Sequence, residues 1–353
     1  MLFIGETWNG SSARSMRGAL ADLPDVEMDD VGEDHYFPKG RSLAIRASNR
    51  ILRPWQRAAL ESEIYGKLAA FKPDVLLVYK GSGVSAAVVR RAKLSGVFTV
   101  NIFPDYSPHA YGIAVRRALE EYDLVISTKP FHPAGWWPTY GYGNACVCVP
   151  HGYDPAVHLW PAPSDAQDLD LALAATWRPE YHELMQHLAV SLAGLDLRVG
   201  IIGAGWVERA NQFPSHWELS QSRTGRSYGE WLRRGRIVIA PVNLDVVISG
   251  LRQPGDEEST RTYELAAMGC FFLHRRTPFV QTIYDEAAEV PMWNNANELA
   301  ELVRRFLPLE ASRRAMAARA HAKAVPAYSI PNRASQVLEQ LEIAMGKHSK
   351  ASR

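Results

Sequence analysis

The chain lacks the features that mark secreted and membrane-spanning proteins. Its 353 residues include only three cysteines, Cys146, Cys148 and Cys270, and no CxxC motif. A secreted-style disulfide framework is therefore not expected. We expect a reducing, cytoplasmic setting instead. The opening MLFIGETWNG has neither the basic start nor the apolar core of a signal peptide. No apolar run approaches the length of a membrane span, so no transmembrane segment is expected.

The chain also lacks an excess of either charge. Lys and Arg total 39 and Asp and Glu total 38. Such a balance gives no electrostatic case for nucleic acid as the main partner. Apolar residues make up 47% and charged residues 22%, as in an ordinary soluble globular protein. The length predicts two domains, each large enough for its own core.

Apolar runs alternate with amphipathic segments through the first half of the sequence. Strands this apolar, each separated by a helical pattern, predict a parallel sheet covered on both faces. The predicted strands lie within residues 1–5, 73–81, 98–105, 122–129 and 145–152.

A second series of the same kind follows a Pro- and Asp-rich stretch at 151–170, which is predicted to connect two domains. The fold class expected is α/β, with two Rossmann-like domains facing across a cleft and ligands outside the carboxyl ends of the strands. The predicted strands of this series lie within 169–176, 195–205, 235–243 and 270–276. The predicted domains are 1–155 and 165–330, followed by a C-terminal helix and tail at 331–353. This helix can cross back to the first domain.

The stretch GIIGAGWVE (200–208) is similar to a dinucleotide-binding fingerprint but fails its requirements. Gly203 and Gly205 match the first two glycines, whereas Glu208 occupies the third glycine position. The stretch also follows the second predicted strand of its domain, not the first. A glycine-containing turn is the better interpretation, and a dehydrogenase is set aside.

The stretch GDEESTRTYELAAMGCFFLH (255–274) combines acidic residues with the start of a short helix. Ser259 and Thr260 are favourable N-cap residues and Gly269 suits a helix C-terminus, which predicts a helix over 260–268. The first turn of such a helix exposes unpaired N–H groups at the positive end of the macrodipole. It is therefore expected to bind an anion, best matched to phosphate.

Two charged side chains strengthen this interpretation. Arg261 lies in the first turn, where a cation is unfavourable for the helix unless an anion is bound. Glu264 lies one turn further on, where its carboxylate can accept hydrogen bonds from the hydroxyl pair of a sugar. The pattern predicts a site for a nucleotide diphosphate. The simpler alternative is an (i, i+3) surface ion pair between the two side chains.

These residues resemble a known family. RTYELAAMGCFFL resembles the R-x-x-E-A-x-A-x-G pattern of GT-B glycosyltransferases, most closely the spore-maturation CgeB-like branch. CVPHGYDPAVH resembles the linker of that family, and YGEWLRRGRIVIAPVN resembles the helix and strand that precede its motif. The resemblance covers roughly residues 70 to 345. It implies an enzyme, of the hexosyltransferase class, that moves a sugar from a nucleotide diphosphate sugar to a hydroxyl-bearing acceptor, whether saccharide, lipid-linked or small molecule.

The resemblance also implies roles for individual donor-side residues. Arg178 would reach the diphosphate, whereas Tyr228 and Asn243 would border the nucleobase. Glu264 would be the second of two acids separated by seven residues and would bind the ribose; the first position falls on Asp256. Two alternatives remain open: Arg178 is a solvated surface residue, and Tyr228 is an aromatic residue of the core. Arg252, in the loop leading to the site, is also predicted to bind the sugar donor.

The first domain carries three further candidates. Gly10 lies in the loop after the first strand, where backbone can approach a donor phosphate or an acceptor sugar; an ordinary turn is equally open. Asp105 and His109 follow a strand in NIFPDYSPHAYG, where a base would deprotonate an acceptor hydroxyl. The alternatives are a helix-capping Asp105 and a buried loop His109.

No D-x-D metal motif is evident at a strand end, so catalysis is expected to be metal-independent and to need no cofactor beyond the nucleotide sugar. Charge on the leaving diphosphate would be met by Arg178, Arg261 and the helix N-terminus. Two other functions stay open: a nucleotide-sugar binding protein without transfer activity, and a GT-B-type sugar epimerase.

Overall fold

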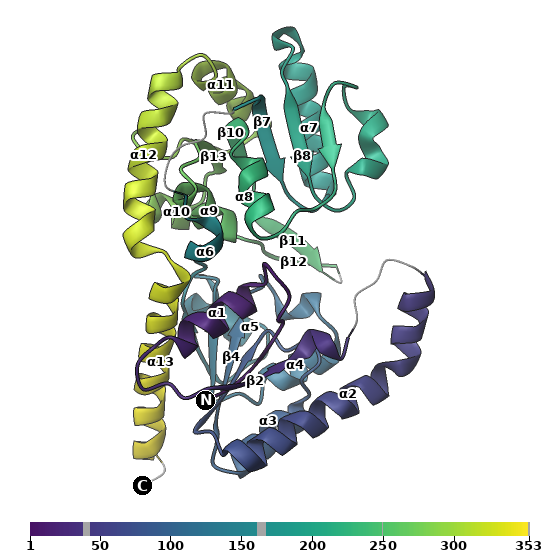
Figure 1. Ribbon diagram of the computed structural model, residues 1–353, viewed down its shortest axis with the longest axis vertical. Helices are drawn as coiled ribbons and strands as arrows, with labels where there is room; N and C mark the ends of the chain where they lie inside the picture. The colour runs from purple at the N-terminus through teal and green to yellow at the C-terminus, as the bar shows by residue number, and fades with distance from the viewer. Residues whose placement is uncertain (38–42, 161–166, 249, 352–353) are drawn as a thin grey trace. The chain divides into compact units, whose positions relative to one another are not determined.

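The computed structural model describes residues 1–37, 43–160, 167–248 and 250–351, so residues 161–166 of the predicted linker lie outside the described part (Figure 1). The chain divides into two compact units. Unit 1 comprises Met1–Pro150, Val246–Pro254 and Ile330–Arg353. Unit 2 comprises His151–Asp245 and Gly255–Ser329. Each unit contains a six-stranded sheet, and every strand pair recorded in both sheets is parallel, which confirms the predicted α/β class.

The sheet of unit 1 has the strand order β2-β1-β3-β4-β5-β6. The five predicted strands are confirmed, and β3 is buried along its whole length, as expected of a parallel strand covered on both faces. The sequence missed the edge strand β2, in which two acidic residues precede two buried ones. The strands are β1 (Leu2–Gly5), β2 (Asp29–Gly32), β3 (Val75–Tyr79), β4 (Phe98–Phe103), β5 (Leu124–Ser127) and β6 (Ala145–Cys148).

Helices cover both faces of this sheet. On one face, α2 (Leu43–Phe71), α3 (Ala86–Leu94), α4 (Ile113–Leu119) and α5 (Trp137–Thr139) contribute to a core with Leu2 and Ile4. On the other, α1 (Ser12–Ala21) and α13 (Ile330–Ala351) pack against each other and against Phe3 (Figure 1). Alternate residues of β1 thus serve opposite faces. The C-terminal helix does return to the first unit of the chain.

The sheet of unit 2 has the order β14-β13-β10-β7-β8-β9. The four predicted strands are confirmed, and the two missed strands are short edge strands. From β7 the chain continues to β8 and β9 on one side, and from β10 to β13 and β14 on the other. The switch point lies between β7 and β10. The strands are β7 (Leu169–Ala174), β8 (Val199–Ile202), β9 (Glu218–Ser220), β10 (Gly235–Ala240), β13 (Phe272–Arg275) and β14 (Met292–Trp293).

Two cores flank this sheet. One contains residues of α8 (Arg226–Leu232), α9 (Thr260–Ala267), α10 (Pro278–Ile283) and α12 (Glu310–Ala327), with α9 and α12 in contact (Figure 1). The other contains residues of α7 (Pro179–Ser191) and α11 (Ala296–Phe306). The short α6 (Pro155–His158) contacts α8 and α9.

The glycine pair after β8 forms a turn, as the sequence analysis favoured. Gly203 has φ 153°, and a Cβ added there would lie 1.8 Å from the carbonyl oxygen of Ala175. Only glycine fits such a close approach. Two further strands, β11 (Asp245–Ile248) and β12 (Leu251–Pro254), form a small separate sheet. In the described ranges, no helix is both long and apolar enough to cross a membrane.

Candidate functional site

Arg261 lies at the switch point of the unit 2 sheet. Its guanidinium donates from Nη1 to the carbonyl oxygen of Ala174 at 2.7 Å and from Nη2 to that of Pro241 at 3.0 Å. Ala174 is the last residue of β7, and Pro241 directly follows β10. Arg261 therefore ties the start of α9 to the carboxyl ends of both central strands, where doubly wound sheets bind their ligands.

The first turn of α9 presents free backbone donors. The helix begins at Thr260 after an extended Ser259 (φ −145°, ψ 172°), close to the predicted start. The Thr262 amide donates to the carbonyl of Ser259 at 2.9 Å, whereas within the described residues those of Thr260 and Arg261 have no backbone acceptor. The Ser259 side chain and the Thr262 side chain form a capping box at this helix start. The amides of Thr260 and Arg261, at the positive end of the helix, suit an anion.

A buried chain of hydrogen bonds holds this turn in place. The Thr262 hydroxyl lies 2.9 Å from Nε2 of His274, and Nδ1 of that ring lies 2.7 Å from the carbonyl oxygen of Arg275. Because a carbonyl can only accept, Nδ1 carries the proton and Nε2 accepts from Thr262. Burial lowers the pKa of His274 to about 4, which keeps the ring neutral. Oγ1 of Thr262 then accepts from the Ser259 amide at 3.1 Å, so every donor meets an acceptor.

Glu264 lies one turn into α9 between two polar partners. Its Oε2 accepts from the Tyr228 hydroxyl at 3.1 Å, and its Oε1 lies 3.6 Å from Nε2 of His158. Burial raises the pKa of Tyr228 well above its usual value, so the phenol remains a donor. Glu264 and Arg261 form no ion pair in the described part of the chain, and the simpler alternative of a surface pair is wrong. Glu264 is instead fixed in orientation by Tyr228.

Three consecutive acids precede α9 and differ in their surroundings. The Asp256 amide donates to the carbonyl of Asn243 at 2.7 Å. Burial raises the pKa of the Glu257 carboxyl. Glu258 is fully buried, with Oε1 3.8 Å from Nε2 of His151. The sequence analysis singled out Asp256 alone and missed both Glu258 and His151.

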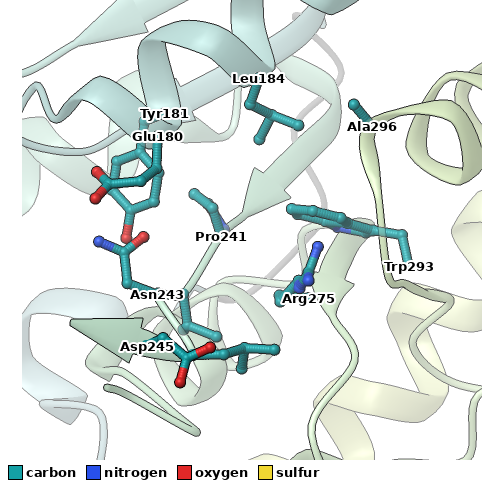
Figure 2. A pocket seen from close by; sticks show the side chains of 11 residues that line it. Glu180, Tyr181, Leu184, Pro241, Asn243, Asp245, Arg275, Trp293 and Ala296 are labelled. Atoms are coloured by element: carbon teal, nitrogen blue, oxygen red, sulfur yellow. The ribbon is translucent and has the colours of Figure 1, made fainter. Parts of the chain in front are cut away.

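A cavity of about 270 Å³ is lined by residues of unit 2 only, including Pro241, whose carbonyl oxygen accepts from Arg261 (Figure 2). Asn243 lines it and is only 8% exposed, and its Nδ2 has no hydrogen-bond partner among the described residues. Arg275 and Trp293 form another part of the wall (Figure 2). The lining residues are Glu180, Tyr181, Leu184, Pro241, Val242, Asn243, Leu244, Asp245, Arg275, Trp293 and Ala296.

Gly255 controls the path of the chain between this cavity and α9. A Cβ added to Gly255 would lie 1.8 Å from the carbonyl oxygen of Asn243, which already accepts from the Asp256 amide. We expect Gly255→Ala to displace this loop and to lower the free energy of unfolding by about 1–3 kcal/mol, as overpacking does. Urea denaturation measures the loss. Gly194→Ala is the control because an added Cβ there meets nothing within 4 Å; equal effects of both changes would contradict the expectation.

Arg178 is the N-cap residue of α7, the helix that follows β7. It is half-buried, and its side chain makes no hydrogen bond or ion pair within the described residues. Burial raises the pKa of Tyr181, which lines the cavity, and the charges of Arg261 and Arg178 oppose that rise. A guanidinium at this strand end with unoccupied donors is suited to bidentate contact with phosphate.

A second cavity, of about 180 Å³, lies within unit 1 and also adjoins a switch point, between β1 and β3. Glu6, Trp8, Gly10 and Lys80 are among its lining residues. Gly10 adopts φ 97°, and Lys80 follows β3 in the left-handed region at φ 64°. Nζ of Lys80 lies 3.2 Å from Oδ2 of Asp105, so the candidate base is held next to this cavity.

His109 and Arg252 also belong to unit 1. His109 lies in a short turn, where its amide donates to the Ser107 hydroxyl at 3.2 Å, and burial lowers the pKa of its ring. Arg252 is exposed on β12, next to Gln253, whose side-chain oxygen accepts from Ser107. The structure therefore separates the candidates into two groups. Unit 2 holds Arg178, Tyr228, Asn243, Ser259, Thr260, Arg261 and Glu264; unit 1 holds Gly10, Asp105, His109 and Arg252.

No group of three or more His, Cys, Asp or Glu side chains is placed to hold a metal ion in the part of the chain that the structure describes. The sequence analysis missed Tyr181, Thr262, His274, Arg275 and Trp293. Arg275 and His274 end a predicted strand, so their position at its carboxyl end was a usable signal. The hydrogen bond between Thr262 and His274 had no signal in the sequence.

Comparison with known proteins gives one family match. Residues 178–339 match a family model described as glycosyl transferase-like. The matched range contains α9 and all the unit 2 candidates named above. No curated protein matches the chain.

Solved structures match nearly the whole chain at low identity. Sucrose-phosphate synthase from Thermosynechococcus elongatus is 14% identical with a TM-score of 0.66, covering 97% of this chain and 99% of that one. Anabaena HepE, solved with UDP-glucose, is 12% identical with a TM-score of 0.67, covering 97% and 98%. A putative UDP-N-acetylglucosamine 2-epimerase from Listeria monocytogenes is 14% identical with a TM-score of 0.58, covering 98% and 97%. These likenesses establish the GT-B fold, and with the family match they support glycosyl transfer.

Proposed function

We propose that this chain is a metal-independent glycosyltransferase that moves a hexosyl group from a nucleotide diphosphate sugar to an acceptor hydroxyl. Unit 2 binds the donor and unit 1 binds the acceptor. We further propose that the chain belongs to the CgeB-like branch and acts in the cytoplasm on a saccharide, a lipid-linked or a small-molecule acceptor. UDP-glucose is the first donor to test, because the HepE structure was solved with it.

The observation that carries this proposal is the position of Arg261 and Glu264 on α9. Arg261 joins the helix start to the carboxyl ends of β7 and β10, where doubly wound sheets bind ligands, and within the described residues the Thr260 and Arg261 amides have no backbone acceptor. Glu264, one turn on, offers a carboxylate held by Tyr228 to the ribose hydroxyls. Donors fixed before the reaction stabilise charge on a leaving diphosphate without reorganisation.

The chemistry of transfer assigns a role to Asp105. Its carboxylate takes the proton of the acceptor hydroxyl as that oxygen bonds to the anomeric carbon, and the bond from this carbon to the phosphate oxygen breaks. The nucleotide diphosphate leaves with the electron pair, and its charge is met by Arg178 and the amides of α9. Lys80, paired with Asp105, keeps the carboxylate in place.

A turnover assay separates this proposal from its rivals. Purified protein is incubated with UDP-glucose, with and without a panel of acceptors, and UDP release is measured. Release that depends on acceptor supports transfer. Interconversion of sugar epimers without acceptor would identify an epimerase, as the Listeria neighbour's name suggests for that protein. Binding without either reaction would identify a nucleotide-sugar binding protein.

Glu264→Ala is expected to weaken donor binding by about 10- to 100-fold, because it removes charge-assisted hydrogen bonds to the ribose. Isothermal titration with the nucleotide diphosphate of the accepted donor measures the loss. Tyr228→Phe is the matched control: it removes the hydroxyl that orients Glu264 at 3.1 Å but keeps the carboxylate, so a smaller loss is expected. Unchanged binding by Glu264→Ala would remove the ribose assignment.

A further inference from the structure

The cavity of Figure 2 contains a guanidinium that the surrounding residues leave unsatisfied. Arg275 ends β13, and its Cζ lies 5.0 Å from the centroid of the Trp293 ring. Within the described residues its side chain makes no hydrogen bond or ion pair. Burial lowers the pKa of this guanidinium, and the charge of Glu298 offsets only part of that effect. Arginine stays charged at neutral pH, so an anion in the cavity would stabilise it.

Two nearby arginines are already occupied by protein groups. Arg276 pairs with Glu286 and lies 3.5 Å from a carboxylate oxygen of Glu298. Arg261 donates to two main-chain carbonyls at 2.7 and 3.0 Å. Of these three side chains, Arg275 is the one whose five donors remain available to a ligand.

Neutral polar groups line the same cavity. Asn243 and Tyr181 are each 8% exposed, and Figure 2 shows their polar ends lying close together on one wall. Nδ2 of Asn243 has no hydrogen-bond partner among the described residues. An unsatisfied buried amide is costly, so this group also favours a polar ligand.

Two carboxylates complete the polar lining and restrict the kind of anion. Glu180 and Asp245 are exposed, whereas Arg275 is half-buried. A simple anion would be attracted by Arg275 and repelled by these two groups. A ligand that places an oxyanion on Arg275 and a hydroxyl on Glu180 would suit both groups. At about 270 Å³ the cavity lies just below the usual range for small-molecule sites, which favours a small ligand.

We propose that this cavity binds a sugar phosphate, with a phosphate oxygen on Arg275 and a sugar hydroxyl on Glu180. The proposal rests on the proposed function, since a sugar phosphate is either the glycosyl-phosphate end of the donor or a separate phosphorylated sugar that binds unit 2 in addition to the donor. Asn243 and Tyr181 provide further hydrogen bonds to the ligand. Arg275 binds through its planar pair of donors, as guanidinium does with phosphate generally.

Titration of the full chain with glucose 1-phosphate, glucose 6-phosphate and glucose tests the proposal. Arg275→Gln is expected to weaken binding of a sugar phosphate by about 10- to 100-fold, and Arg275→Lys by less, because Lys keeps the charge but not the paired donors. Glucose should bind more weakly than either phosphate. Arg305→Gln is the matched control: this exposed arginine also lies over an aromatic ring, with Cζ 5.0 Å from the centroid of Phe306, but outside the cavity. Urea denaturation without ligand checks that each variant folds.

Competition with UDP-glucose distinguishes the two sources of the sugar phosphate. Displacement of glucose 1-phosphate by UDP-glucose would assign the cavity to the donor, and simultaneous binding of UDP and glucose 6-phosphate would assign it to a separate phosphorylated sugar. Either result supports the site. Unchanged affinity in Arg275→Gln, or sugar phosphates bound no better than glucose, would overturn it. If the site is overturned, acceptor-dependent release of UDP would still establish the proposed function. If sugar phosphates bind tightly but no acceptor-dependent release of UDP occurs, the proposed function is wrong and the site remains.

Discussion

Asp105→Asn is expected to lower kcat by about 100- to 10,000-fold, the contribution of a positioned general base, with little change in donor affinity. Asn keeps the shape of the side chain but cannot take the acceptor proton. Asp105 follows β4 in unit 1, with Oδ2 3.2 Å from Nζ of Lys80, a residue that lines the unit 1 cavity. Steady-state kinetics with the best donor and acceptor pair measures the loss.

Asp22→Asn is the control for this change, because Asp22 is an exposed residue at the end of α1 in the same unit. It should leave kcat unchanged. A loss of activity in His109→Gln but not in Asp105→Asn would show that the base is His109. Asp105 would then be left with a structural role beside Lys80.

Arg261→Ala is expected to lower the free energy of unfolding by about 3 kcal/mol, because two charge-assisted hydrogen bonds are lost and two carbonyls lose their partner. The same change should abolish detectable donor binding, since the start of α9 is no longer tied to β7 and β10. Urea denaturation and calorimetric titration measure the two effects.

Arg178→Ala provides the contrast. Arg178 has no hydrogen bond or ion pair within the described residues, so its loss should weaken donor binding while leaving the urea midpoint unchanged. If Arg261→Ala were as stable as Arg178→Ala, the two carbonyl contacts would contribute little. Arg261 would then have to act on the ligand directly.

Local sequence signals predicted much of the fold. The start of α9 was readable because Ser259 is a good N-cap residue and Gly269 ends the helix, and both signals act within a few residues. The central strands were readable because parallel strands covered on both faces are continuously apolar. The edge strand β2 was not readable, because it begins with two acidic residues instead of an apolar run. Asp29 and Asp30 form ion pairs with residues elsewhere in the chain, Lys67 at 2.6 Å and Arg17 at 2.9 Å.

The site was predictable in position but not in detail. Sequence placed Arg261 and Glu264 at the start of a helix beside a strand, which is where the structure has them. The partners of Arg261 are main-chain carbonyls of Ala174 and Pro241, 87 and 20 residues away in the chain. Main-chain acceptors leave no mark on residue type, so no pattern could reveal them. Arg275 was missed although its position at the end of a predicted strand was a usable signal, because the sequence does not show which side chains lack protein partners.

A crystal structure of the chain with UDP tests the central claim most directly. The account predicts diphosphate oxygens within hydrogen-bond distance of the Thr260 and Arg261 amides, with both ribose hydroxyls on the carboxylate of Glu264. UDP bound away from the carboxyl ends of β7 and β10, with the first turn of α9 unliganded, would contradict it.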